Sequence, residues 1–207
     1  MENMPVKSPI ITPSLKPRSR VAAARTQLDP DRWIDEAIDV LAREGISGLR
    51  VEVLAKKCGV TKGSFYWHFK DRQALLDAVL EQWKRGRILD IEKTTSVTVG
   101  DERDQLHYAI ELYGASKNRK GMSIELAIRD WARRDPGAAK VVEAVDLYRL
   151  ECTRKLFVAT GMSDAEAKSR SLLLYACVFG LSLMHYTQFD QDLASLKQRI
   201  AERIITD

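Results

Sequence analysis

The stretch from Leu49 to Leu76 reads LRVEVLAKKCGVTKGSFYWHFKDRQALL and decides the fold of this chain. Its first half carries one apolar helical face at positions i, i+3 and i+4, formed by Val51, Leu54 and Ala55. Gly59 suits the left-handed position that ends a helix, because a Cβ would clash there. Thr61 has the chemistry of an N-cap. The spacing therefore predicts two helices joined by a tight turn, which is helix-turn-helix geometry.

The side chains left outside this predicted core suit DNA. Between Arg50 and Gln73 there are six cations and only two anions. The second helix adds hydroxyls and flat rings, which match phosphate oxygens and base edges in a major groove. Gly63 lies inside that helix, where glycine costs about 1 kcal/mol relative to alanine, so we expect a partner to approach its backbone closely. The alternative is a purely structural aromatic core built on Phe65 and Phe69.

The segment GVTKGSFYWHFKDRQALL closely resembles the DNA-binding signature of TetR-type transcriptional regulators. The resemblance in motif covers about residues 29–83, and the rest of the chain matches in length, helicity and helix order. It implies that bases are contacted from the start of the second helix and phosphates from its later part. The residues that we predict to contact DNA are Arg50, Thr61, Lys62, Gly63, Ser64, Tyr66, Trp67, His68 and Lys70.

Two positions depart from the usual pattern of the family. Arg50 stands where threonine is common, which replaces a hydroxyl contact to phosphate with a guanidinium. Arg72 stands where lysine is usual.

The 207 residues, 45% of them hydrophobic, allow one large domain or two small ones. The net charge of +4 lies in the first 28 residues, because the remainder is neutral. We predict three segments: a disordered, basic, proline-rich tail at 1–28, a helix-turn-helix head at 29–83, and a helical ligand-sensing and dimerisation domain at 84–207. The tail is either inert or an arm that adds DNA contacts.

Helix start signals predict an all-α fold. Asp29-Pro30 and Asp135-Pro136 each combine an N-cap with a proline at the first helical position, and Ser163 opens a capping box. Expected helices after the signature are, by residue number, about 71–93, 106–118, 122–134, 136–160, 163–188 and 193–205. Within 122–134, Glu125 and Arg129 form an i+4 pair that we interpret as solvated helix support.

The helix that follows Ser163 predicts how the chain assembles. Its sequence LLLYACVFGLSLM is apolar on nearly every side, and a helix that is apolar all round is buried all round. One face can pack on its own domain, and a second copy of the chain is the simplest cover for the other. Gly180 would permit close approach. We therefore expect a twofold homodimer, built as a four-helix bundle from the last two helices of each chain.

Other classes of protein have little support. Three distant cysteines indicate neither a disulfide framework nor a zinc site, which fits a cytoplasmic protein. The uncharged run from Ser171 to Phe189 contains polar residues and is expected inside the protein, not in a membrane. No catalytic motif appears, and no cofactor is expected. His107, with Asp104 and Glu111 on its face, is a possible metal cluster or, as we prefer, an exposed helix residue, so no metal site is predicted.

The leading hypothesis is a dimeric transcriptional regulator, most simply a repressor that leaves its operator DNA when it binds a small-molecule effector. The residues that we predict to line an effector pocket are aromatic: Tyr108, Tyr113, Trp131, Tyr148, Phe157, Tyr175 and Phe179. Each can instead be ordinary core packing. One alternative is a constitutive DNA-binding dimer without a ligand. Another is a small-molecule-binding helical protein or enzyme with a vestigial head.

Overall fold

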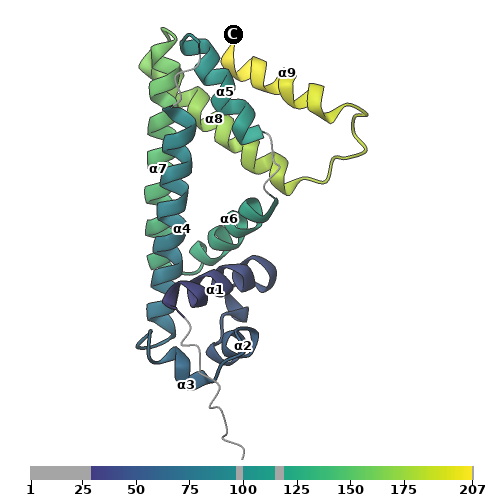
Figure 1. The fold of residues 1–207 in the computed structure, drawn as a ribbon. Coiled ribbons are helices and arrows are strands. Elements are labelled where there is room, and N and C mark those ends of the chain that lie inside the picture. The colour runs from purple at the N-terminus through teal and green to yellow at the C-terminus, as the bar shows by residue number, and fades with distance from the viewer. Residues whose placement is uncertain (1–28, 97–99, 115–118, 207) are drawn as a thin grey trace, which may run out of the picture.

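Helices make up every regular element in the computed structural model, which describes residues 29–96, 100–114 and 119–206 (Figure 1). The predicted all-α class is confirmed. The head consists of α1, a short 3-10 helix η1, α2 and α3; their bounds are Pro30–Glu44, Ile46–Gly48, Val51–Lys57 and Lys62–Phe65. The predicted tail at 1–28 lies outside the described residues.

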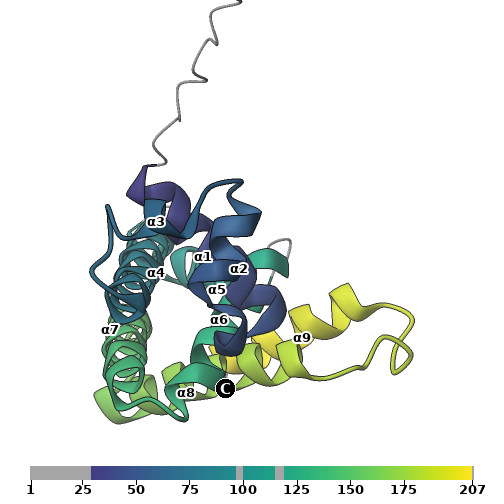
Figure 2. The ribbon, with the colours of Figure 1, turned by 90° about the horizontal axis from the view of Figure 1, so that it is seen from below.

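Two long, adjacent helices form the spine of the remaining chain. The later helices are α4 Arg72–Thr95, α5 Glu102–Gly114, α6 Arg119–Ala132, α7 Pro136–Ala159, α8 Asp164–Leu183 and α9 Leu193–Ile205. Helices α4 and α7 lie side by side, with the head at one end and α5, α8 and α9 at the other (Figure 1). Helix α6 packs on both α1 and α7. Viewed from the head, α8 and α9 extend to one side of the spine (Figure 2).

The helix starts agree with the sequence because the capping chemistry is local. The side chains of Asp71 and Asp135 accept hydrogen bonds from the third residue beyond, at 2.9 and 2.8 Å. Ser163 Oγ accepts from the backbone N–H of Glu166 at 3.2 Å. Asp192, which the sequence analysis did not single out, caps α9 in the same way. Each bond satisfies a backbone donor that the first turn of a helix leaves free.

Three helices and one cap differ from expectation. Helix α5 spans Glu102–Gly114, where the sequence predicted about 106–118. Helix α8 ends at Leu183, not near Gln188, because Met184 adopts an extended backbone with φ −85° and ψ 145°. Helix α6 begins at Arg119, before the expected residue 122, and ends at Ala132. Thr61 occupies the N-cap position of α3 with an extended backbone, but its side chain makes no capping hydrogen bond.

The interpretation of Glu125 and Arg129 as solvated helix support was wrong. Glu125 is 3% exposed, and Arg129 also donates to both carboxylate oxygens of Asp146 on α7, at 2.8 and 2.5 Å. The i+4 spacing identified the pair correctly. It could not reveal burial, because burial depends on how α7 packs against α6.

Two apolar clusters hold the described helices together. The first runs from the head into α4, α6 and α7, and includes Trp33, Phe65, Trp131 and Val142. The second joins α5, α7, α8 and α9 through side chains such as Phe157 and Leu174. Helix α4 passes through residue 83 without interruption, and the domain boundary placed there stays a prediction.

No helix among the described residues is long and apolar enough to cross a membrane. The three cysteines, Cys58, Cys152 and Cys177, are free and half-buried.

Arg72 ties the start of α4 to the connection between α1 and α2. Its Nε donates to the carbonyl oxygen of Leu49 at 2.5 Å, and its Nη2 donates to that of Ile46 at 3.1 Å. The planar guanidinium holds both donors in one fixed fork, which a lysine cannot do. This gives a structural reason for arginine at a position where lysine is usual in the resembling family.

We therefore expect Arg72→Met to lower the free energy of unfolding by about 1–2 kcal/mol, since it removes two hydrogen bonds from a charged donor. Arg72→Lys should lose about half as much. Urea denaturation measures both. Arg43→Met is the control, because the pair of Arg43 with Asp39 is exposed and long, at 3.6 Å; it should change stability by less than about 0.5 kcal/mol. Equal changes in the free energy of unfolding for Arg72→Met and Arg43→Met would contradict a stabilising role for the hydrogen bonds of Arg72.

Candidate nucleic-acid interface

The turn between α2 and α3 is closed by backbone hydrogen bonds. Gly59 adopts φ +69°, the left-handed conformation that glycine accepts without strain. The N–H of Val60 donates to the carbonyl of Ala55 at 3.0 Å, and the N–H of Gly59 donates to that of Lys56 at 3.2 Å. This pattern ends α2 and directs the chain into α3, as the sequence predicts.

Phe65 fixes the orientation of α3, which has only four residues. Its side chain is fully buried. Its ring meets Trp33 of α1 edge to face, with centroids 5.4 Å apart, and stacks on Phe69 at 5.3 Å. Tyr66 packs edge-on against it at 5.2 Å. Because α3 is too short to be stable alone, these ring contacts determine which of its side chains face outward.

Most of the predicted DNA-contacting side chains lie exposed around α3. The exposed members are Arg50, Thr61, Lys62, Gly63, Tyr66, Trp67 and Lys70, whereas Ser64 and His68 are half-buried. Trp67 is 79% exposed, which is an unusually large apolar surface to leave in water. The α2–α3 unit thus brings cations, hydroxyls and flat rings to one end of the molecule.

His68 is the least accessible of the predicted phosphate contacts. Its Nε2 atom is buried and has no hydrogen-bond partner. Any contact with DNA would have to come from the other ring nitrogen. The sequence gives no sign of this, because the burial arises from the path of the chain after α3.

Lys62 is already paired within the protein. Its Nζ donates to Oε1 of Glu52 on α2. The hydrogen bond from Lys62 lowers the pKa of Glu52, and the same bond raises the pKa of Lys62. Both side chains are more than half exposed, so water screens the pair. The sequence analysis missed this contact. Glu52 therefore belongs to the candidate interface as an anion beside the start of α3.

Gly63 has no neighbour inside the protein that requires glycine. A Cβ built there would meet only Oγ1 of Thr61, at 3.7 Å, which is ordinary van der Waals contact. Its φ does not lie in the left-handed region. Packing within the chain therefore does not account for glycine at this exposed position.

The predicted effector-pocket aromatics whose side chains are described do not all meet at one site, although the rings of Tyr175 and Phe179 lie 5.3 and 5.4 Å from the guanidinium carbon of Arg149. Trp131 and Tyr148 pack with the first apolar cluster, and Phe157 lies in the second. Tyr175 is buried and shares a 3.0 Å hydrogen bond with Thr153. Phe179 is half-buried, with its ring 4.1 Å from the guanidinium carbon of Arg129.

The other two predicted aromatics, Tyr108 and Tyr113, lie on α5. Tyr108 is exposed, and the side chain of Tyr113 is outside the described residues.

Tyr148 connects the two long helices. Its hydroxyl donates to Oε1 of Glu92 on α4 at 2.9 Å. That hydrogen bond raises the pKa of Tyr148 to about 12. The hydrogen bond links α7 to α4.

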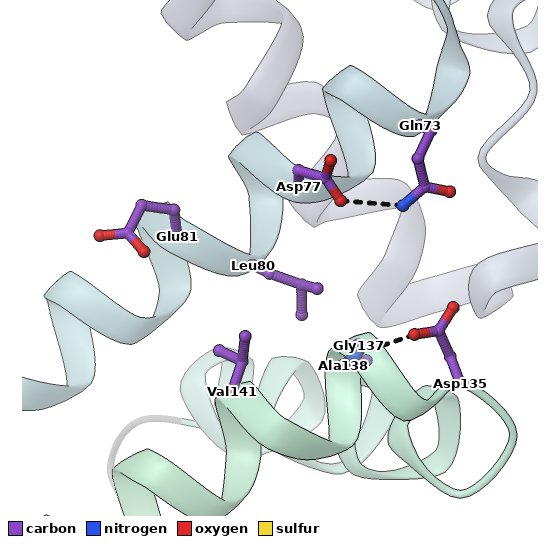
Figure 3. Close-up of a pocket in the computed structure, with 8 residues that line it drawn as sticks. All are labelled: Gln73, Asp77, Leu80, Glu81, Asp135, Gly137, Ala138 and Val141. Atoms are coloured by element: carbon purple, nitrogen blue, oxygen red, sulfur yellow. Dashed lines mark hydrogen bonds between the residues drawn. The ribbon is translucent and has the colours of Figure 1, made fainter.

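A hollow of about 260 Å³ lies between α4 and the start of α7 (Figure 3). Its lining residues are Gln73, Asp77, Leu80, Glu81, Asp135, Gly137, Ala138 and Val141. Three of its polar side chains are already engaged, because Gln73 donates to Asp77 and Asp135 caps α7. None of the seven predicted aromatics lines it, so this hollow is a poor match to the predicted effector pocket.

The metal cluster considered around His107 has no support among the described side chains. They contain no group of three His, Cys, Asp or Glu residues that could hold an ion. The side chain of Glu111, one of its three members, is outside that description.

Comparison with known proteins identifies the head and its relatives. Residues 34–79 match the family model for bacterial regulatory proteins of the tetR family. The chain is 33% identical over 95 residues to the HTH-type transcriptional regulator SrpR of Pseudomonas putida, over 43% of this chain and 45% of SrpR. It is 32% identical over 95 residues to the uncharacterized HTH-type transcriptional regulator TtgW, also of Pseudomonas putida, over 43% of this chain and 71% of TtgW.

Solved structures share the arrangement of helices. A transcriptional regulator from Saccharomonospora viridis, solved in complex with choline, superposes with a TM-score of 0.70 over 85% of this chain and 94% of its own, at 17% identity. At that identity the likeness establishes a common fold. The match spans about half of SrpR but more than two thirds of TtgW. From the family model at the head and the relationship to TtgW, we conclude that the chain belongs to the TetR family of bacterial regulatory proteins.

Proposed function

We propose that the protein is a homodimeric, sequence-specific DNA-binding transcriptional regulator, a repressor that a small-molecule effector releases from its operator. The observation that carries this proposal is the exposed set of cations, hydroxyls and rings around α3, held in place by the buried ring of Phe65. Such a protein acts in the cytoplasm, where the bacterial chromosome is, and by binding instead of catalysis.

The roles within the head follow from position and chemistry. Thr61, Lys62 and Gly63 stand at the start of α3 and are exposed, which suits contact with base edges. Thr61 makes no capping bond, so its hydroxyl is available to a partner. Tyr66 and Lys70 follow and suit phosphate oxygens, as does Arg50 at the start of α2. Trp67 would lose its exposed apolar surface against the sugar–phosphate backbone.

The exposed face of α8 supports the dimer. Leu172 and Leu173 are 62% and 54% exposed, and Leu183 and Met184 near its C-terminal end are also exposed. The predicted burial of this helix on all sides is therefore not achieved within one chain. A second copy packed against α8 and α9 would remove these side chains from water, at about 25 cal/mol for each Å² of apolar area. A twofold axis there would pair the two heads for successive major grooves, about 34–36 Å apart.

Release by an effector would act through the long helices. Helix α4 runs from the head to the far end of the molecule, and Tyr148 ties it to α7 through Glu92. An effector that favours one tilt of α4 would move the two heads out of register with the DNA. Thermodynamic linkage then requires that DNA weaken effector binding by the same factor as the effector weakens DNA binding. The likeness to a regulator solved with choline supports the presence of a small-molecule site in this fold.

A constitutive DNA-binding dimer is the second candidate. The observation in its favour is that the predicted pocket aromatics are largely packed in apolar clusters or hydrogen-bonded within the protein.

The operator test begins with footprinting on the DNA beside the gene for this chain. On the site found, Tyr66→Phe and Lys70→Ala should weaken binding to all DNA sequences. Lys70→Ala should also lower, by about one unit, the slope of the logarithm of the binding constant against the logarithm of the salt concentration. Lys62→Ala should instead relax base preference, by about 1–3 kcal/mol at one position. Lys155→Ala, an exposed lysine on α7, is the control. Unchanged affinity for the residue 66 and 70 variants at every salt concentration would refute the assignment.

Gly63→Ala should separate stability from DNA binding. A Cβ meets no close neighbour there or at Gly86, inside α4. Both Gly63→Ala and Gly86→Ala should therefore leave stability unchanged or raise it by up to about 1 kcal/mol. Only Gly63→Ala should weaken operator binding, at least tenfold, because its methyl group would meet the DNA. Thermal melts and binding isotherms test this, and full operator affinity in Gly63→Ala would show that DNA does not approach this backbone.

Leu173→Glu should convert the dimer to a folded monomer with weaker operator binding, since a charge would enter the subunit interface without disturbing the chain's own core. Leu89→Glu is a matched control, because Leu89 is also 54% exposed and lies on a different helix, α4. Sedimentation at micromolar concentration distinguishes the species. A wild-type protein that sediments as a monomer would overturn the dimer.

A further inference from the structure

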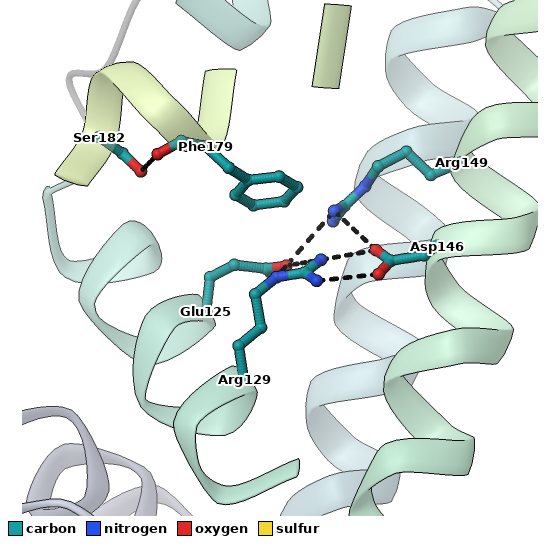
Figure 4. Close-up of polar contacts among 6 residues, drawn as sticks. All are labelled: Glu125, Arg129, Asp146, Arg149, Phe179 and Ser182. Atoms are coloured by element: carbon teal, nitrogen blue, oxygen red, sulfur yellow. Dashed lines mark hydrogen bonds and ion pairs between the residues drawn. The ribbon is translucent and has the colours of Figure 1, made fainter. Parts of the chain in front are cut away.

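Four charged side chains form one network between α6 and α7 (Figure 4). Nη1 and Nη2 of Arg129 donate to the two carboxylate oxygens of Asp146 at 2.8 and 2.5 Å. Nε and Nη2 of the same guanidinium donate to Oε1 of Glu125 at 3.0 and 2.8 Å. Arg129 is therefore well satisfied by its two carboxylate partners.

The other two members are not satisfied. The side chains of Arg149 and Glu125 are only 7% and 4% exposed. Nη1 of Arg149 reaches Glu125 and Asp146 at 3.3 Å in both cases, which is long for a charge-assisted hydrogen bond. Nε of Arg149 and Oε2 of Glu125 are buried and have no partner. A buried donor and a buried acceptor left unpaired are costly, so native proteins rarely retain them without a reason.

The charge of the network restricts what could satisfy these atoms. Arg129 and Arg149 balance Glu125 and Asp146, so the four side chains together are neutral. A ligand with a net charge of either sign would leave an uncompensated charge in a poorly solvated place. An uncharged molecule that offers an acceptor to Nε of Arg149 and a donor to Oε2 of Glu125 carries no such cost.

Two rings of α8 give the network a flat apolar side. The ring of Phe179 lies 4.1 Å from the guanidinium carbon of Arg129 and 5.4 Å from that of Arg149, and it points toward the network (Figure 4). The ring of Tyr175 lies 5.3 Å from the guanidinium carbon of Arg149. Arg129 and Asp146 lie at the more exposed edge of the network, with side chains that are 24% and 32% exposed.

We propose that the network of Glu125, Arg129, Asp146 and Arg149 recognises the effector, and that this effector is an uncharged molecule with an amide-like edge beside a flat ring. A carboxamide or a lactam has such an edge, with a carbonyl acceptor next to an N–H donor. The inference rests on the proposed function, because it names the class of effector for that regulator.

The network is placed to influence the head. Ile128 and Trp131 lie on α6, within two residues of Arg129, and both are buried in the apolar cluster that includes Trp33 of α1. Glu125 and Arg129 are thus on the same short helix that packs against the head. A ligand that draws Glu125 or Arg149 into new hydrogen bonds would shift α6 between its contacts with α7 and α1.

The test uses three ring-matched probes that differ in charge: 4-fluorobenzamide, 4-fluorobenzoate and 4-fluorobenzylamine. Fluorine NMR titrations on the full chain report weak binding of each. We expect saturable binding of the amide and at least tenfold weaker binding of both ions. Arg149→Lys, which keeps the charge but removes the Nε donor, should weaken the amide at least tenfold. Glu125→Gln makes the network cationic and should reverse the preference toward the benzoate.

Two further variants guard against loss of folding. Phe179→Leu removes the ring without touching the charges and should weaken the amide severalfold. Glu151→Gln changes a carboxylate on the same helix as Arg149 that pairs with Arg154 at the surface, and it should leave the selectivity of the wild type.

Three results would overturn the proposal. The first is that no probe binds saturably, which would leave a structural ion network completed by water. The second is that the wild type prefers either ion, and the third is that Arg149→Lys, Glu125→Gln and Phe179→Leu all leave amide binding unchanged. Operator binding without any probe is measured in parallel. If it persists while the amide fails, the effector class is wrong and the DNA-binding function stands.

Discussion

The contact between Trp33 and Phe65 fixes the orientation of α3, on which the DNA-facing surface of the head depends. Helix α3 has four residues and cannot be stable by itself, so its direction is set by the one ring that it buries. Phe65 is fully enclosed, edge-on to Trp33 and stacked on Phe69. Once that ring is fixed, the geometry of the helix determines the direction in which the neighbouring side chains point. Lys62, Tyr66 and Trp67 are turned outward because Phe65 is turned inward.

The local parts of this fold could be predicted because their causes are local. Caps at Asp71, Asp135 and Ser163 depend on a side chain and a backbone N–H three residues later. The left-handed Gly59 depends on one backbone angle. Within the candidate interface, the exposure of Lys62 and Tyr66 follows from their offset to Phe65. The sequence pattern alone was therefore sufficient for these features.

The parts that could not be predicted depend on how side chains from different helices meet in the folded chain. Glu125 became a buried ion because Asp146 and Arg149, on another helix, cover it. Lys62 found Glu52 across the turn, and the ring of His68 turned one nitrogen into the protein. The aromatics of the later helices were each plausible pocket residues, yet helix packing separated Trp131 from Phe157 into different clusters. Periodicity shows which face of a helix is apolar, but not which partner covers it.

The continuity of the first apolar cluster limits how the head and the later helices can move. One set of buried side chains passes from α1 and α3 through α4 into α6 and α7, so the head is not attached by a free linker. Close-packed interiors do not deform smoothly, and a change at one end must be accommodated by repacking between alternative arrangements. Helix α6 connects the two regions, because its apolar residues pack in the cluster that includes the head, while Glu125 beside them belongs to an incompletely satisfied ion network. Because Glu125 has a buried oxygen without a partner, a small molecule could improve the contacts at that end of α6. A ligand that improves contacts in one arrangement and not in the other shifts the population toward that arrangement.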